Sequence, residues 1–586
     1  MKTVWWLGLV VLTLGLSFVP AQANEVESKP ADTELPASVR EYVASKYFDD
    51  CDPDDPKITK ALETLKVPEA ILSHIRENEW ESGQLENFAT DKLQLILTTP
   101  SGEVHSLVFR DGKKRNDRKL TPERARVLRR LYSDEAFSAP EAKPLADVRK
   151  VQLDKPSVVL EAAIKALDDK HKLDDETLQR ARKNMTAARK GGAELAIALA
   201  ALGATAHAVD NQWAGIWLIS RLDRMGFWRE EDEGSIEDLQ GMDARTFYEN
   251  VVYATKARLE LPWGGKCSDK DFLQQVLSPR GTGEPLQRWR KHYYCALEPE
   301  LKNLKEGDAD KAIALARGAA YDFFQYYGDT TWEDFGMLTA LAVHEGRCED
   351  CSNVENCMLR AAGLPAAQAF TPWWGRGNGN HAWTVIPSID GGKNGNGRKA
   401  VKVYLKTWDK LEDITAVNTT VIDLPVELDE GVKGEKAELN VWNADEWRLV
   451  ARSEIEGSKV TFKDVGASLP FVLLVSAEGS TDRLLTIVDG KVNLLNNAAD
   501  TKPGADVFAL EFEKGCDLGE FEPDEDYVIY MQTSDGWQEV EGERPSTGGL
   551  SFQCDPHRLY RIEGAGINAR PFTAKAGEDG PVVTRF

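Results

Sequence analysis

Beyond its first nineteen residues the chain has little that would place it in a membrane or on nucleic acid. No later segment is apolar enough to span a bilayer, which takes about 20 consecutive apolar residues, so we expect no stable membrane insertion. Positive charge is also scarce: 72 lysine and arginine residues stand against 96 aspartate and glutamate residues, and the formal net charge is -24. An acidic surface repels nucleic acid and anionic membranes, so we exclude both as partners.

The one long apolar run stands at the start of the chain. Met1–Thr3 is short and basic, Val4–Val19 is apolar, and Pro20–Ala23 offers an Ala-x-Ala cleavage site. This order is typical of a cleaved secretory signal peptide. An uncleaved membrane anchor is the alternative, but the run is short for a span and ends in small residues. We therefore predict a signal peptide over residues 1–23 and a chain that is secreted, periplasmic or at the cell surface.

The chain lacks an internal repeat, and its length of 586 residues is too great for one ordinary domain. Periodicity is mainly helical before residue 345 and alternates in short strands after about residue 400. We predict a multidomain α+β protein. Its predicted parts are the signal peptide 1–23, a linker 24–40, a helix-rich N-terminal region 41–310, an α+β core 311–424, a β-sandwich module 425–500 and a C-terminal β module 501–586.

Three local predictions concern the helix-rich region. Residues 93–97 and 104–109 flank a Pro-Ser-Gly turn and predict a β-hairpin. The basic residues Lys113–Arg115 that follow are interpreted as a solvated loop. Residues 285–289 are expected to continue the helical layer.

The candidate catalytic cysteine lies on a predicted helix of the core, which we call the cysteine helix. Cys351, Val354, Met358 and Ala361 recur at helical spacing, and Gly363 followed by proline ends the predicted helix. Cys348 then lies in the first turn, where unpaired N–H groups and the helix dipole favour an anion. We expect a lowered thiol pKa at this position, and hence a nucleophile. A small buried structural cysteine is the alternative.

His381 is the predicted base. It stands where the glycine-rich segment 377–380 leads into a strand, in the sequence Asn-His-Ala-Trp. If the cysteine helix packs on this strand, the imidazole can take the thiol proton and later protonate a leaving amine.

Three segments in this order resemble the transglutaminase-like superfamily. They are Gly346-Arg-Cys-Glu-Asp, Leu359-Arg-Ala-Ala-Gly-Leu-Pro-Ala and Asn380-His-Ala-Trp, within residues 315–410. The resemblance implies a papain-like Cys-His-Asp core, with Cys348 as the nucleophile and His381 as the base. The flanking segments more loosely resemble large exported bacterial members that carry β domains after the core.

The sequence departs from the family pattern beyond the cysteine. The family often has an aromatic residue and alanine three and four positions after it, where this chain has Cys351 and Ser352. The third catalytic residue is expected on the next strand. If residues 382–389 and 400–408 form a hairpin, Asp409 returns beside His381, although no proline follows it; Asp390 is the other candidate.

Aromatic residues and the remaining cysteines are assigned less specifically. Trp332 or the pair Trp373–Trp374 is expected to line an acyl groove or to pack in the core. Cys516 with Cys554 and Cys267 with Cys295 are candidate disulfides in an exported chain. A zinc site is a rival interpretation of the cysteine helix, with ligands among His344, Cys348, Cys351, Cys357 and His381.

The predicted function is a cysteine hydrolase or acyltransferase that attacks an amide bond and forms a thioester. No cofactor is expected. The substrate would be a peptide or protein, with or without glycans, and peptide hydrolysis, glutamine cross-linking and deglycosylation all remain open. The alternative is a fold that has lost activity and binds a surface partner or glycan. Nothing in the sequence specifies an oligomeric state.

Overall fold

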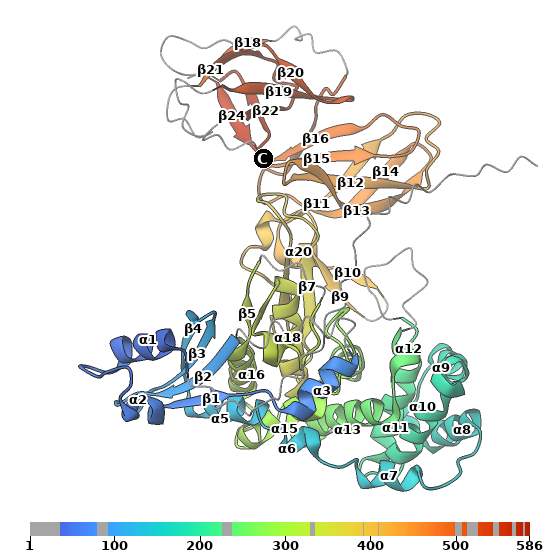
Figure 1. Cartoon of the computed structure of the whole chain (residues 1–586). Helices are drawn as coiled ribbons and strands as arrows, with labels where there is room; N and C mark the ends of the chain where they lie inside the picture. Colours follow the sequence, from blue (N-terminus) through green and yellow to red (C-terminus); the bar gives the residue numbers. More distant parts are fainter. Residues whose placement is uncertain are drawn as a thin grey trace, which may run out of the picture.

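The computed structural model describes residues 35–78, 92–224, 237–328, 334–390, 392–407, 410–498, 507–512, 526–542, 550–564, 570–577 and 581–586. Helices of the first half form the base in Figure 1, an α/β core stands on them, and two β-rich modules lie above the core. The architecture is therefore α+β and multidomain, as predicted. The predicted signal peptide, residues 1–23, lies outside the described residues.

The first described part is a pair of helices on an antiparallel sheet. The helices are α1 (Ala37–Tyr47) and α2 (Pro56–Ala61). The strands follow in sheet order as β1 (Leu62–Leu65), β2 (Lys92–Thr98), β3 (Val104–Arg110) and β4 (Lys113–Leu120). The central strands β2 and β3 are buried on both faces, because α1 covers one face and α16 contacts the other through Gln94 and Ser106.

This part confirms one prediction and corrects two. The predicted hairpin is β2 and β3. The predicted linker 24–40 overlaps a helix, since α1 begins at Ala37. Lys113–Arg115 are not a loop but the start of β4: Lys113 and Lys114 pair with Arg110 and Phe109 of β3, Arg115 lies at the bulge that follows, and all three side chains stay exposed at this edge of the sheet.

Helices dominate the following residues and pack mainly through aliphatic and aromatic side chains. They are α3 (Glu69–Asn78), α5 (Pro122–Leu131), α6 (Glu135–Ser138), α7 (Lys143–Val148), α8 (Pro156–Ala166), η1 (Asp169–His171), α9 (Asp175–Ala187), η2 (Arg189–Gly192), α10 (Ala193–Leu202), α11 (Ala208–Ile219), α12 (Glu237–Gly241), α13 (Ala244–Glu260), η3 (Gly264–Lys266), α14 (Asp269–Asp271), η4 (Phe272–Val276) and α15 (Trp289–Leu301).

A buried loop, residues 277–288, interrupts this layer between η4 and α15. It corrects the expectation that residues 285–289 continue the helices. The Glu284 carboxylate accepts hydrogen bonds from the backbone N–H groups of Gly281 and Thr282. In a helix these N–H groups would bond to backbone carbonyl groups. Here the Glu284 side chain accepts their hydrogen bonds instead, and the loop can therefore be buried.

The core combines two long helices with a four-stranded antiparallel sheet in the order β10-β9-β7-β8. Its elements are α16 (Ala309–Phe323), β5 (Gln325–Tyr326), α17 (Ala340–Val343), β6 (Glu345–Gly346), α18 (Cys348–Ala361), β7 (Ala367–Thr371), β8 (His381–Val385), α19 (Pro387–Asp390), η5 (Gly397–Lys399), β9 (Tyr404–Lys406), β10 (Leu411–Asp413) and α20 (Thr415–Asn418).

The strand order contradicts the predicted hairpin between residues 382–389 and 400–408. β7 lies between β8 and β9 and pairs with both, with Thr371 opposite His381 and Phe370 opposite Tyr404. The segment that leaves the cysteine helix therefore takes the inner position, and β8 lies at the end of the described sheet.

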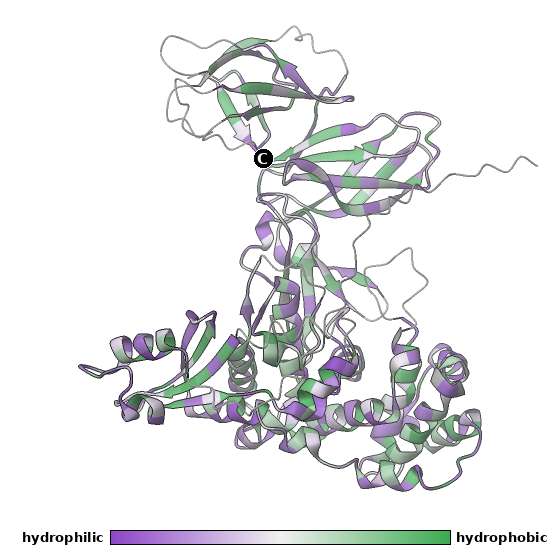
Figure 2. Ribbon diagram, in the orientation of Figure 1, coloured by the Kyte–Doolittle hydropathy of each residue, from purple (hydrophilic) through white to green (hydrophobic). Residues whose placement is uncertain are grey.

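Two β-rich modules complete the chain, as predicted. The first is a seven-stranded sheet whose strands are β11 (Val421–Glu427), β12 (Lys436–Asn443), β13 (Glu446–Glu456), β14 (Lys459–Gly466), β15 (Phe471–Ser476), β16 (Arg483–Val488) and β17 (Lys491–Leu494). Much of β15 and β16 is green in Figure 2, in keeping with their buried apolar side chains. The second contains β18 (Phe508–Phe512), β19 (Val528–Thr533), β20 (Gly536–Val540), β21 (Leu550–Cys554), β22 (Tyr560–Glu563), β23 (Phe572–Lys575) and β24 (Val582–Arg585).

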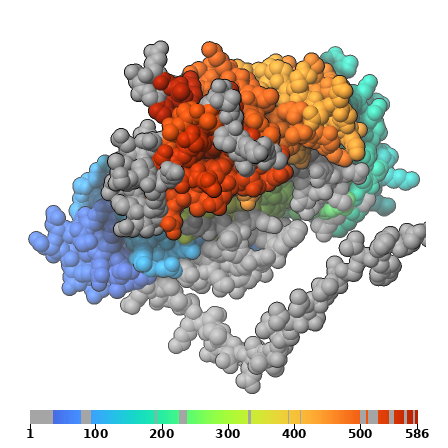
Figure 3. Space-filling model, turned by 90° about the horizontal axis from the view of Figure 1, so that it is seen from above, coloured from blue at the N-terminus to red at the C-terminus, as the bar shows by residue number. Residues whose placement is uncertain are grey.

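The two modules share a small core. Trp442, Val472 and Leu484 of the first pack with Leu559 and Phe586 of the second. In the end-on view of Figure 3 the red C-terminal module lies directly against the orange strands of the first. The modules are thus joined by buried apolar surface as well as by the chain. No helix in the described stretches is long and apolar enough to cross a bilayer.

Candidate functional site

Helix α18 begins at Cys348 because a carboxylate of its own first turn caps the residue that precedes it. Arg347 precedes it in an extended conformation, and Asp350 accepts hydrogen bonds from the N–H groups of Arg347 and Phe335 at 2.8 and 2.9 Å. Gly363, with φ of 73°, ends the helix as predicted. The predicted apolar face packs into the main core through Val354, Met358 and Ala361. Cys348 is thereby fixed at the first helical position.

The Cys348 thiol is less acidic than expected. Burial and the neighbouring Glu349 carboxylate, to which Sγ donates a hydrogen bond at 3.1 Å, raise the thiol pKa to about 12. Backbone N–H groups of Ala382 and Glu349 favour the thiolate and oppose this rise. The expectation of a lowered pKa is wrong here, because desolvation and a like charge outweigh the helix terminus.

His381 opens β8, as predicted, and its ring contacts two tryptophans. The indole rings of Trp374 and Trp383 stack on it, with centroids 5.9 and 5.5 Å from that of the imidazole and interplanar angles of 26°. Burial lowers the pKa of His381, and the Glu349 charge opposes this shift. The imidazole is therefore neutral at neutral pH and can accept a proton.

Strand β8 packs on α18, which brings the two predicted residues onto adjoining elements. Thr384 donates a hydrogen bond to the Ser352 carbonyl at 3.2 Å. At the other end of the strand, the backbone N–H of Ala382, the residue after His381, acts to lower the pKa of Cys348. The predicted nucleophile thus lies beside the strand that begins with the predicted base.

The third predicted residue is not placed by the structure. Asp409 lies outside the described residues, and so does Trp332 of the predicted groove. Asp390 ends α19, and its side chain is likewise outside the description. The hairpin on which the prediction of Asp409 depended is nevertheless not formed: β9, which precedes Asp409, is separated from β8 by β7. Neighbouring strands lie about 4.8 Å apart, so β9 and β8 are roughly 10 Å apart.

Sequence reasoning missed a buried lysine on this sheet. Lys406 is 5% exposed, and its ammonium lies 5.2 Å from the centre of the Phe370 ring. Burial lowers its pKa to about 7, while the negative charges of Asp334, Glu349 and Glu284 oppose the shift. A buried amine that titrates near neutral pH, on the same sheet as the candidate base, is a feature of functional sites. In the sequence, Lys406 alternates with Leu405, and this pattern indicated only that the two side chains lie on opposite faces of the strand.

The buried loop 277–288 also reaches this region. Thr282 donates to Asp334 at 3.0 Å, and Arg347 contacts the same carboxylate at 2.6 Å. The Asn353 amide donates to Thr282 at 2.8 Å, which ties the loop to α18. The glycine-rich Arg280-Gly-Thr-Gly-Glu segment was the available sequence signal, since glycines permit close backbone approach. A Cβ on Gly281 would lie 2.5 Å from the Asn353 side chain.

The rival zinc set is not assembled. His344 is buried elsewhere, with Nδ1 3.0 Å from the Phe323 carbonyl, and burial lowers its pKa to about 4. Cys357 is enclosed in the apolar core. Within the described part of the chain, no group of three or more His, Cys, Asp or Glu side chains is placed to hold a metal ion. Cys267 and Cys295 are separate thiols, which corrects that disulfide prediction, and Cys516 lies outside the described residues.

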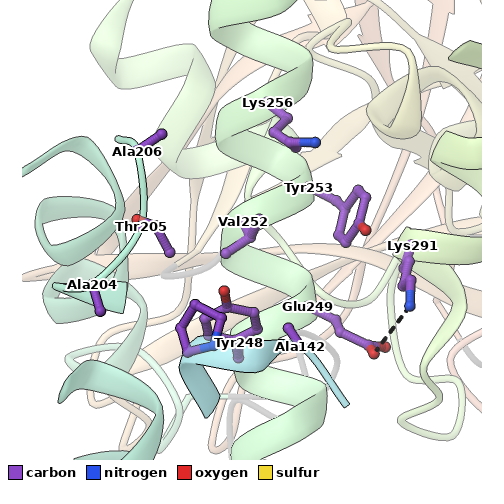
Figure 4. A pocket seen from close by; sticks show the side chains of 11 residues that line it. Ala142, Ala204, Thr205, Ala206, Tyr248, Glu249, Val252, Tyr253, Lys256 and Lys291 are labelled. Carbon is purple, nitrogen blue, oxygen red and sulfur yellow. Dashed lines mark ion pairs between the residues drawn. The ribbon is translucent and has the colours of Figure 1, made fainter. Parts of the chain in front are cut away.

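A cavity of about 340 Å³ lies in the helical region (Figure 4). Tyr248, Val252, Tyr253 and Lys256 of α13 form one wall, and Lys291 approaches from α15. Cys348 and His381 are not among its lining residues. The cavity is therefore separate from the site at α18 and β8.

Comparison with protein families supports the assignment made from the motifs. The family model of the transglutaminase-like superfamily matches residues 296–394, which extend from within α15 to just beyond α19 and include Cys348 and His381. This match begins and ends somewhat earlier than the expected 315–410. No curated protein matches the chain.

Proposed function

We propose that residues 296–394, which belong to the transglutaminase-like superfamily, make this chain a cysteine acyl-transfer enzyme that acts on amide bonds. The observation that carries the proposal is the placement of Cys348 in the first turn of α18, a helix that packs on the strand beginning with His381. His381 precedes Ala382 on the same strand, so nucleophile and base come from adjoining elements.

The raised thiol pKa defines how the first step must proceed. A thiol with a pKa of about 12 is almost wholly protonated at neutral pH, so the proton must leave as the sulfur attacks. The neutral imidazole of His381 accepts that proton, and the S–C bond forms while the carbonyl π electrons move to oxygen. The first N–H groups of α18 are positioned to stabilise this oxyanion.

The second step releases the amine. The oxyanion collapses, the C–N bond breaks, and the His381 imidazolium donates its proton to the departing nitrogen. This leaves a thioester on Cys348. Water or a second amine then gives its proton to His381, attacks the thioester and expels the sulfur, which regains a proton from the imidazolium. The substrate class we propose is a peptide or protein, with or without glycans.

We further propose that the chain is exported and resembles large bacterial members with β modules behind the core. The support is the basic, apolar and small-residue pattern of residues 1–23. Mass analysis of the protein recovered outside the cytoplasm is expected to give Asn24 as the first residue. Recovery with Met1 retained would contradict cleavage.

One observation favours a second function, the binding of a surface partner or glycan without turnover. The Glu349 carboxylate accepts a hydrogen bond from the Cys348 thiol and offers the sulfur no donor, so it stabilises the thiol over the thiolate. A fold that had lost catalysis would tolerate such a neighbour. In that case the site near α18 would hold a partner without forming a covalent bond.

The two functions are separated by trapping an acyl-enzyme. The full chain would be incubated with an unstructured peptide, with a glutamine peptide plus a primary amine, and with an N-glycopeptide, then quenched in acid for intact mass. We expect an acyl adduct with at least one donor, and its absence from Cys348→Ala. His381→Ala should slow product formation by about 100-fold or more, the usual contribution of a general base.

Cys351→Ala is the matched control, because Cys351 is a half-buried thiol one turn further along the same helix. It should retain the adduct and the product. If the wild-type chain gives neither adduct nor product with any donor, and Cys348→Ala binds these peptides as tightly as wild type, the binding function replaces the catalytic one.

A further inference from the structure

A loop of nine residues, 372–380, connects β7 to β8 and carries Trp374 to the face of the His381 ring. We call it the histidine loop. Gly377 and Gly379 have φ of 117° and 77°, values that favour glycine. Within the loop the N–H of Trp374 donates to the Gly379 carbonyl at 3.0 Å, and the N–H of Arg376 donates to the Lys399 carbonyl of the core at 3.1 Å. The other polar backbone groups of the loop depend on side chains that contact it.

Asn443, at the end of β12 in the first β module, supplies most of those contacts. Its amide Nδ2 donates to the carbonyl oxygens of Trp374, Gly379 and Gly377, at 2.8, 3.0 and 3.1 Å. Its Oδ1 accepts from the N–H of Gly379 at 2.8 Å. The side chain is fully buried. One amide therefore ties together the two ends of the histidine loop.

The position of Asn443 follows from a tight hairpin. It pairs with Glu446 across the β12–β13 turn, whose two central residues, Ala444 and Asp445, have φ of 49° and 64°. Two left-handed residues are the signature of the type I′ turn, which joins adjacent strands without splaying them. The turn thus holds the Asn443 backbone rigidly at the edge of the first β module.

Further contacts hold the loop on the same side. Gly375 lies so close to the first β module that a Cβ there would be 2.5 Å from the Phe471 ring. Arg570 of the C-terminal module donates to the Gly375 carbonyl at 3.4 Å, and Arg376 donates to the Arg585 carbonyl. Residues from both β modules therefore contact the loop that leads to His381 and support it from the same side.

We propose that Asn443 is a positioning residue of the candidate active site: by fixing the histidine loop it holds Trp374 against the imidazole of His381. The first β module is then a structural part of the site and not a spacer. The proposal rests on the proposed role of His381 as the base.

The consequence of losing the amide can be stated physically. Without Nδ2, the carbonyl groups of Trp374 and Gly377 lose their buried donor and must turn toward water, while that of Gly379 keeps only the N–H of Trp374. The loop then moves from the module, Trp374 leaves the His381 ring, and solvent reaches the imidazole. Cys348, Glu349 and Glu355, titratable groups that α18 presents beside β8, are unchanged by the substitution.

The test measures His381 itself in the full-length chain, so that it does not depend on knowing a substrate. Diethyl pyrocarbonate acylates neutral imidazole, and peptide mass analysis gives its rate at each histidine between pH 5 and 8. For Asn443→Ala we expect the His381 peptide to react several-fold faster than in wild type, with an apparent pKa that moves up toward the ordinary value of about 6.5.

Two variants make the comparison specific. Asn443→Asp keeps the size of the side chain but replaces the donor with an oxygen that faces three carbonyl oxygens, so it should behave like Asn443→Ala. Asn440→Ala is the matched control: Asn440 lies in the same strand and is also buried, but its amide contacts Leu474 and Ser476 within the module. The His381 rate and pH profile should be those of wild type in this variant.

The outcomes are distinct from those that test the proposed function. Unchanged His381 reactivity in both Asn443 variants, or an equal increase in Asn440→Ala, would overturn the positioning role. If the chain forms no acyl-enzyme but His381 responds as expected, the proposed function fails while the structural role of Asn443 stands. If a substrate is found, Asn443→Ala should lower kcat more than it raises KM, since orientation of the base matters after binding.

Discussion

At Cys348 a helix terminus and a carboxylate act on the same sulfur in opposite directions. The free N–H groups of the first turn favour a thiolate, whereas Glu349 and burial favour the thiol. Burial and Glu349 dominate, because desolvation and an adjacent full charge have a larger effect on the thiol pKa than the partial charge of a helix end. The nucleophile is therefore kept protonated until a base takes its proton.

Glu349→Gln should make this thiol more acidic. The substitution removes the negative charge and keeps the size of the side chain, so the pKa of Cys348 falls and more thiolate is present at any given pH below it. We expect faster alkylation of Cys348 by iodoacetamide at pH 8, measured by peptide mass analysis. The pH midpoint of the alkylation rate should shift down.

Glu298→Gln is the matched control. Glu298 raises the pKa of Cys295 on α15 in the same way, through its charge. The variant should speed alkylation of Cys295 and leave the rate at Cys348 unchanged. An equal response of Cys348 to both variants would show that local charge does not set its reactivity.

Lys406 gives the fold a specific pH dependence. In the unfolded chain its pKa is about 10.4, and in the folded chain burial lowers it to about 7. Below pH 7 the amine is charged in both states and the cost of burying that charge is fully present. Between about pH 7 and 10 the unfolded chain binds the extra proton, so this group makes stability rise with pH.

Lys406→Met should remove that rise and increase stability at pH 6.5 by at least about 1 kcal/mol, since one pKa unit corresponds to about 1.4 kcal/mol. Urea unfolding followed by tryptophan fluorescence at pH 6.5 and 9.5 gives the comparison, and the gain should be smaller at pH 9.5. Lys402→Met is the control, because Lys402 forms an ion pair with Asp413. Loss of this ion pair should lower the stability of the folded chain at both values of pH. Equal gains for Lys406→Met at both values would contradict the expected titration.

At the scale of elements, local sequence predicted most of what formed. The hairpin of β2 and β3, the first turn and end of α18, and the short strands of the first β module follow from alternation, capping and glycine placement. The pairing of β8 did not follow. Both β7 and β9 are short strands with apolar side chains, and local sequence does not say which of them pairs with β8. The direction in which the chain leaves α18 places β7 there.

The β12–β13 turn is an element in which sequence and conformation disagree. Ala444 has φ of 49°, which costs a residue with a Cβ about 1–2 kcal/mol relative to the right-handed region. Ala444→Gly should therefore stabilise the first β module by about 0.5–1 kcal/mol after the greater chain entropy of glycine is included. The measurement is the urea midpoint of the full chain.

Ala437→Gly tests the same exchange where glycine has no conformational advantage. Ala437 is fully buried within β12, so the variant should destabilise by about 1 kcal/mol, through the lost methyl group and the added chain entropy. If both exchanges destabilise, the left-handed conformation of Ala444 carries no cost in this turn.

At the scale of the whole molecule, the modules behave as one assembly around the histidine loop. The first β module covers Trp373 and Val401 of the core within its own apolar cluster, and Asn443 holds the loop. Modules that a linear plan would treat as separate are thus joined to the candidate site by apolar burial and by hydrogen bonds.

A chain that ends at residue 419 should lose this support. Without Phe471 and Asn443 the histidine loop is exposed, and trypsin should cleave after Arg376 much faster than in the full chain. A chain that ends at residue 498 keeps both residues and loses only the C-terminal module, so cleavage should rise less. Equal protection of Arg376 in all three chains, read by peptide mass analysis, would mean that the modules do not support the loop.

The sequence by itself determined the superfamily segment, the order of helical and β-rich parts, and the two candidate catalytic residues, because these depend on short-range patterns and on residue identity. Only the tertiary structure decided the acidity of Cys348, the place of β7 between β8 and β9, and the contacts of Lys406 and Asn443 near the site. The physical reason is distance along the chain. Asn443 lies more than sixty positions after the loop that it holds, and no periodicity within either segment records that the two will meet.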